Sequence, residues 1–287
     1  MFPLVDTKDA TAVASFVGTT FEQIHPGAGT VWLRTIFNDV EDLFGGRRAD
    51  YAAIDLRYHD FEHTLQATVC LCQLLRNRHL AESLPALDAR HFELSLSAVL
   101  LHDTGYLKLQ SDRAGTGAKY TYCHVLRSCA FAATYLPTIG ANDQEIEVVL
   151  NAINCTGPAN EIAQVHFRDP VARVIGCALG TADYLGQMSA PDYPDELEDL
   201  FHEFQEADEF VHVPLSRRIF KSASDLIERT PTFWQQFVRR KLEFEFQGMY
   251  RFLADPHAGG RNLYLEAVER NIVEIGRRMA CPAVSPR

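Results

Sequence analysis

The chain of 287 residues lacks features that would assign it to a membrane, secreted or zinc-finger class. No uncharged apolar run is long enough to cross a bilayer. The opening segment MFPLVDTKDA has no basic region followed by an apolar core, as a secretory signal would. Cysteines are present, but their number, 7, is odd and their spacing fits no zinc finger. We therefore expect a cytoplasmic protein with reduced thiols and no membrane partner.

Positive charge is also scarce. The chain has 27 Lys and Arg against 38 Asp and Glu, which gives a formal net charge of −11. An acidic surface repels a phosphate backbone, so a large nucleic acid is disfavoured as a partner. A small phosphorylated substrate, such as a nucleotide, remains compatible with this charge. A bound cation and a few local basic groups can reverse the potential inside one pocket.

Alternating, strand-like stretches bounded by turn residues are hard to find. Apolar residues recur instead at helical spacing, and 47% of the residues are apolar, enough for a large core. The sequence therefore predicts an all-α fold. We expect a helical extension over residues 1–50, a core over 51–190, further helices over 191–280 packed on the core, and a tail over 281–287. The C-terminal helices could instead pack on another subunit, so a homo-oligomer stays open.

Two segments differ from the rest of this helical pattern. Residues 104–120 contain three glycines and predict a long loop, and long loops in compact domains are often functional. Residues 191–210 contain nine acidic side chains, no Lys or Arg, and an apolar stripe. This second pattern favours a solvated amphipathic helix. The individual helices are expected near residues 58–78, 89–102, 121–136, 142–154, 168–186, 191–210, 215–228, 231–252 and 262–279.

The string YHDFEHT, residues 58–64, carries two histidines four positions apart, His59 and His63. On the helix expected there, both imidazoles lie on one face, one turn apart. Such a pair can share a metal, or one can bind the metal while the other contacts the substrate. The spacing alone is a weak signal, because two partly exposed helix residues give the same pattern.

Two carboxylates lie in segments of core character. The string AVLLHDTGY, residues 98–106, ends an apolar helix with His102 and Asp103, and Asp183 lies within another apolar helix. Burying a carboxylate is costly unless it is paired or bound to a cation. A metal ion would remove that cost at both places. For Asp183 the alternatives are solvent exposure or an ion pair with an arginine such as Arg173.

The order of these residues is more specific than any one of them. His63, then His102 and Asp103, then Asp183, on three separate helices, resembles the HD-domain superfamily of metal-dependent phosphohydrolases. YHDFEHT also resembles the YHN-x-x-H segment of the class I cyclic-nucleotide phosphodiesterases, which are related to that superfamily. The resemblance implies an HD-type helical bundle, with the metal-binding core over residues 51–190 and these four side chains as ligands.

The resemblance also implies roles for neighbouring residues. His124 matches the place where two-metal members carry a further histidine ligand, and Asp103 would be able to bridge two ions. Asn154 stands where many of those members carry yet another histidine. Because Asn is a weaker ligand, we expect one ion, or one tight and one loose, and keep Asn154 as a substrate contact. His59 would protonate the leaving alkoxide, and Asp103 could accept the proton of the attacking water.

The ligand types do not choose among Mn, Fe, Mg, Zn and Ni. Any such ion lowers the pKa of a bound water and polarises a phosphoryl oxygen. Lys108, in the glycine-containing loop, is expected to contact the phosphate. The alternative for Lys108 is an ordinary solvated loop residue.

These features predict a metal-dependent phosphohydrolase that acts on a small phosphorylated molecule. A nucleotide-type phosphodiester is favoured over a phosphomonoester because of the YHDFEHT string. Two alternatives stay open. One is a non-catalytic HD-type module that senses a ligand. The other is a di-iron HD-type oxygenase, which needs more histidine ligands than the sequence shows.

Overall fold

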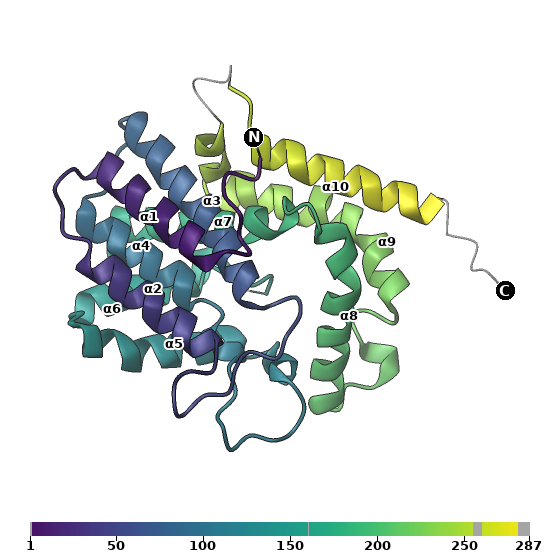
Figure 1. Cartoon of the computed structure of the whole chain (residues 1–287). Helices are drawn as coiled ribbons and strands as arrows, with labels where there is room; N and C mark the ends of the chain where they lie inside the picture. The colour runs from purple at the N-terminus through teal and green to yellow at the C-terminus, as the bar shows by residue number, and fades with distance from the viewer. Residues whose placement is uncertain (1, 160, 255–259, 281–287) are drawn as a thin grey trace.

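The computed structural model describes residues 2–159, 161–254 and 260–280, and the predicted tail over 281–287 lies outside them. The fold of the described residues is all-α, as predicted: ten α-helices, short 3-10 and π-helical turns, and no strand beyond two isolated β-bridges (Figure 1). The helices are α1 (Ala10–Ile24), α2 (Val31–Phe44), α3 (Phe61–Leu80), α4 (Ala89–Leu101), α5 (His124–Tyr135), α6 (Asp143–Ile153), α7 (Pro170–Met188), α8 (Tyr193–Phe210), α9 (Ala223–Phe233) and α10 (Leu263–Ala280).

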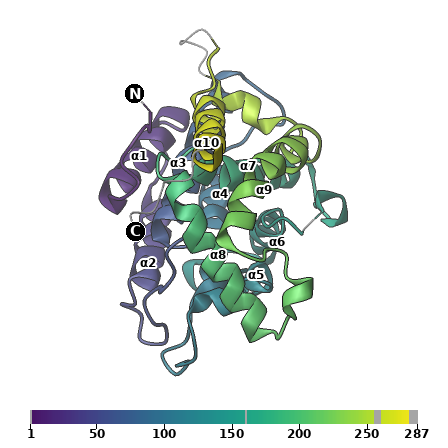
Figure 2. The ribbon, with the colours of Figure 1, turned by 90° about the vertical axis from the view of Figure 1, so that its right-hand side faces the viewer.

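Helices α3 and α7 form the centre of the fold and share its most extensive helix–helix contact. Both are buried around most of their circumference, as expected for helices that are covered on all sides. Helices α1, α2 and α4–α6 lie on one side of this pair, and α8–α10 lie on the other (Figures 1 and 2). Side chains carried by α3 and α7 are therefore shielded from solvent.

One hydrophobic core runs through the molecule. It extends from Val13 in α1 to Ile275 in α10. It therefore includes residues of the three predicted helical segments, 1–50, 51–190 and 191–280. In α1 the buried side chains Val13, Val17, Phe21 and Ile24 recur at helical spacing and face α3. The N-terminal extension and the C-terminal helices are thus parts of the same core as the middle of the chain.

Two predicted helix boundaries are wrong. Helix α3 begins at Phe61 rather than near residue 58, because Asp60 is its N-cap and accepts a hydrogen bond from the His63 backbone at 3.0 Å. His59 therefore precedes the helix. The helix expected over 215–228 begins only at Ala223, where the Ser222 hydroxyl accepts from the Asp225 backbone at 3.1 Å. Beyond α9 the chain continues as the π-helical turns Trp234–Val238 and Lys241–Glu245 and the 3-10 turn Met249–Leu253.

Candidate metal centre

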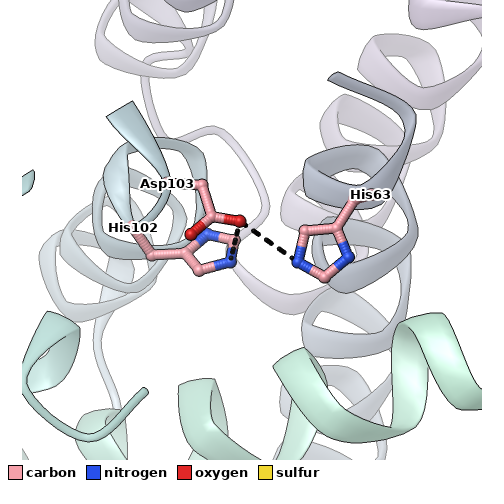
Figure 3. A group of neighbouring side chains, drawn as sticks. All are labelled: His63, His102 and Asp103. Atoms are coloured by element: carbon pink, nitrogen blue, oxygen red, sulfur yellow. Dashed lines mark ion pairs between the residues drawn. The ribbon is translucent and has the colours of Figure 1, made fainter. Parts of the chain in front are cut away.

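His63 lies in the first turn of α3, and its side chain is buried. Its Nε2 atom is 3.2 Å from Oδ2 of Asp103 and 3.4 Å from Oδ1 of Asp183. The chain brings these residues together because α3, the end of α4 and α7 pack on one another. Figure 3 shows His63 facing His102 and Asp103 from the opposite helix.

His102 and Asp103 follow the last residue of α4, where the chain leaves the helix and adjacent side chains can point to one place. The Nδ1 atom of His102 lies 2.7 Å from the Val99 carbonyl, which can only accept, so Nδ1 carries the proton of this contact. Nε2 then faces the carboxylates, 3.3 Å from Oδ2 of Asp103 and 3.5 Å from Oδ1 of Asp183. The backbone thus aims Nε2 of His102 at the same place as Nε2 of His63.

The spacing of these atoms suits a metal ion. Ligand atoms about 2.1 Å from one ion lie about 3.0–3.4 Å apart when they occupy neighbouring positions. His63, His102 and Asp103 form a buried group that could hold an ion, and Asp183 contacts both imidazoles. Nε2 of His102 and Oδ2 of Asp103 are buried without a hydrogen-bond partner in the described part of the chain. A cation would satisfy both atoms.

The charges in this group are strongly coupled. Burial acts to lower the pKa of His63, but its close contacts with the Asp103 and Asp183 carboxylates outweigh that effect and raise the pKa to about 10. Burial acts to raise the pKa of both carboxylates, and the neighbouring imidazoles hold it well below its usual range. The imidazoles thus offset the buried negative charge of the carboxylates, and a metal ion would take over that role.

His124, in the first turn of α5, faces the other oxygen of Asp103. Its Nε2 lies 3.8 Å from Oδ1, and its Nδ1 is 2.7 Å from the Thr121 carbonyl. Gly105 allows this approach, because a Cβ at that position would lie 1.9 Å from the His124 carbonyl oxygen. Asp103 therefore stands between the His63–His102 pair on one side and His124 on the other, as a bridging carboxylate would.

His59 lies at the edge of the same group. Its ring stacks on Tyr106 at a centroid distance of 4.6 Å, and the Tyr106 ring stacks on His124 at the same distance. The His59 and His63 rings are 5.5 Å apart. His59 thus precedes the helix, and its ring lies beside that of His63.

Glu203 of α8 is a site residue that the sequence did not reveal. Its Oε2 lies 2.5 Å from Nδ1 of His59, and its Oε1 accepts from the Tyr58 backbone at 2.9 Å. The prediction of a solvated acidic helix over 191–210 is wrong for this face: Glu203 and Asp208 are buried. Glu203 comes three residues after Leu200 and four before Ala207. Glu203 therefore lies on the same helix face as the apolar stripe, and this position could have predicted its burial.

Lys108 and Asn154 have other partners. The Lys108 ammonium lies 2.8 Å from Oδ2 of Asp55 and also bonds the Gly115 carbonyl. The Asn154 amide donates to the Leu150 carbonyl one helical turn earlier, at 3.0 Å. Both residues thus brace the local backbone, and these contacts lie outside the group around Asp103.

A scan against models of protein families finds no match for the chain, and a search of curated proteins finds none either. The geometry of the centre and the order of its motifs therefore carry the functional proposal. Within the described residues, no helix has the length and apolar character needed to cross a membrane.

Proposed function

We propose that the protein is a metal-dependent phosphohydrolase of the HD type. The observation that carries the proposal is the convergence of Nε2 of His63 and His102 with Asp103 and Asp183 at one buried point. Two of the donor atoms there have no hydrogen-bond partner in the described residues, which favours a cation over a purely structural polar cluster. When bound, a divalent ion supplies a water of lowered pKa and polarises a phosphoryl oxygen.

Asp103 positions the reaction and receives its first proton. Its Oδ2 belongs with the two imidazoles, while its Oδ1 is directed toward His124. A carboxylate in this place can hold the attacking water by a hydrogen bond and take its proton. The residue is buried, so bulk water does not compete for that bond.

His59 donates the second proton, to the leaving oxygen. The buried carboxylate of Glu203 bonds Nδ1, which leaves Nε2 for the substrate. The stack on Tyr106 fixes the plane of the ring. A carboxylate bonded to Nδ1 of an imidazole fixes its tautomer and orientation, as proton transfer from Nε2 requires.

The YHDFEHT string supports a phosphodiester over a phosphomonoester, because it resembles the corresponding segment of the cyclic-nucleotide phosphodiesterases.

Three basic residues near the centre are held by other parts of the chain. Lys108 pairs with Asp55, and Lys119 pairs with Asp112 at 2.6 Å. Arg127 of α5 donates to the backbone carbonyls of residues 105 and 107. These contacts do not favour any of the three as a phosphate ligand.

The test combines metal analysis with a substrate panel. The purified chain is assayed with an aryl phosphodiester and the matching monoester, in Mn²⁺ and then in excess chelator. We expect release from the diester that requires the metal, and loss of both metal and activity in His102→Ala. Bound metal without turnover of any ester or nucleotide would instead indicate a ligand-sensing module. No bound metal would remove the proposal altogether.

A further inference from the structure

A cavity lies at the opposite end of α3 from His63. It has a volume of about 490 Å³ and is lined by the ends of α1 and α3, the start of α4, and the loop between α3 and α4. Its apolar wall includes Ile24, Leu75, Leu87 and Phe92. Cavities of this size with an apolar lining and a few polar groups are typical of small-molecule sites.

Arg78 also lines the cavity, and it is only 3% exposed. Nη2 donates to the Pro85 carbonyl at 2.7 Å, whereas Nε has no hydrogen-bond partner. Within the described residues no carboxylate forms an ion pair with Arg78, which is unusual because a buried guanidinium is normally paired. Burial lowers the pKa of Arg78. The Arg78 guanidinium is thus buried, and no counter-ion offsets the cost of its desolvation.

The other titratable groups leave Arg78 as the main cation of the cavity. His25 and His79 line it with rings 5.8 Å apart, and burial followed by the charge of His79 lowers the pKa of His25. Glu82 also lines the cavity but is exposed. Asp88 is engaged as the N-cap of α4.

We propose that this cavity binds a small organic acid with an apolar body, whose carboxylate pairs with the Arg78 guanidinium. A carboxylate matches one guanidinium in charge and in its two-pronged geometry. The apolar wall would hold the body of the ligand. Leu84, also in the lining, is 86% exposed, so a bound ligand would cover an apolar side chain that now faces solvent.

The site is separate from the metal centre. His63 and Arg78 lie 15 residues apart on the single helix α3, which corresponds to about 22 Å along its axis. Binding in the cavity therefore does not depend on the proposed phosphohydrolase activity. It is measured on the full chain in chelator, where no turnover can contribute.

The experiment compares three eight-carbon probes by titration calorimetry: octanoate, octanol and octylamine. We expect octanoate to bind one per chain, at least tenfold more tightly than octanol, and octylamine more weakly than both. Arg78→Met should reduce octanoate affinity at least tenfold and remove its advantage over octanol. The matched control is Arg76→Met on the same helix, where Arg76 bonds Gln23 at the surface, and it should bind octanoate as the parent chain does.

A second variant covers the case in which Arg78→Met fails to fold. Ala86 is an exposed residue of the lining, so Ala86→Trp adds bulk to the cavity and leaves Arg78 in place. We expect it to keep the parent melting temperature and to lose octanoate binding. Equal affinities for octanoate and octanol, undiminished binding by Ala86→Trp, or displacement of octanoate by inorganic phosphate at equal concentration would each overturn the proposal.

Discussion

Asp103 presents its two carboxylate oxygens to different partners. Oδ2 lies within 3.3 Å of both His63 and His102, and Oδ1 faces His124. The Asp103 side chain thus contacts the imidazoles of His63, His102 and His124. The carboxylate is also buried, so its charge has no solvent to stabilise it.

Asp103→Asn should remove bound metal and hydrolytic activity together. The amide keeps the size of the side chain but loses the negative charge that a divalent ion requires. Elemental analysis and the diester assay measure the two effects. Asp143→Asn, at an exposed position of α6, is the control and should change neither. Full metal content in Asp103→Asn would exclude Asp103 as a ligand.

His59→Ala and Glu203→Gln should separate catalysis from metal binding. We expect His59→Ala to retain the metal and to lower kcat about 10²–10⁴-fold, the usual contribution of a positioned general acid. Glu203→Gln should lower kcat less, because the imidazole remains but loses the carboxylate that fixes its tautomer and orientation. Metal content is measured beside kcat. A parallel loss of metal in His59→Ala would make His59 a ligand and refute its assignment as the acid.

At the scale of elements, the contact between α3 and α7 sets the geometry of the centre. Gly186 of α7 lies against the backbone of Ala67 in α3, where an added Cβ would be 2.8 Å from the amide nitrogen. Asp183 is three residues before Gly186, and His63 is four residues before Ala67. The closest approach of the two helices is therefore about one turn from each ligand.

Gly186→Ala should destabilise the protein and weaken metal binding. The methyl group forces α7 away from α3 backbone atoms that cannot yield, at a cost of about 1–3 kcal/mol. Gly18→Ala is the matched control, since it lies within α1 with no atom within 4 Å of the added Cβ. It should stabilise the chain by about 0.5–1 kcal/mol. Chemical denaturation and metal titration of both variants test this; equal effects would show that the helix contact is not tight.

The acidic helix α8 has one face turned toward the candidate site and another turned toward solvent. Glu203 contacts His59, and Glu206 accepts from the Thr116 hydroxyl at 2.6 Å in the 104–120 loop. Glu198, on another face, is exposed. The inward carboxylates of the helix therefore bond His59 and the 104–120 loop, and the outward carboxylates are solvated.

At the scale of the whole molecule, metal binding and stability are linked through His63. Its pKa in the folded, metal-free chain is raised from 6.5 to about 10. The stability contributed by its protonated form is fully present below pH 6.5 and is lost as pH rises through about 10. A metal must displace that proton, so metal affinity should rise over the same interval.

The stabilisation by metal should therefore increase with pH. At a metal concentration of 100 times Kd, binding adds about 2.7 kcal/mol. For a chain of this size, that corresponds to a rise in Tm of about 4–5 °C. We expect the difference in Tm between Mn²⁺ and chelator to grow from pH 6.5 to pH 9, as measured by thermal unfolding. Asp103→Asn should show no difference at any pH. A difference that shrank with pH would mean that metal does not compete with the His63 proton.

The all-α fold and the helix order could be predicted because helical periodicity is a local property of the sequence. A partner for Asp103 could also be anticipated, since a carboxylate in an apolar helix needs a cation wherever the helix lies. Both inferences depend on short stretches of chain. The grouping of His63 with His102 and Asp103 was instead what the resemblance to the HD-domain superfamily implied.

The partners of those residues were decided only by the tertiary structure. Glu203 reaches His59 across 144 positions of sequence, and Lys108 is paired with Asp55 across 53. The composition of 191–210 predicts an amphipathic helix but does not say which carboxylates turn inward. That choice depends on the crossing of α8 over the site, where the cost of burying Glu203 is offset by a hydrogen bond to a distant imidazole.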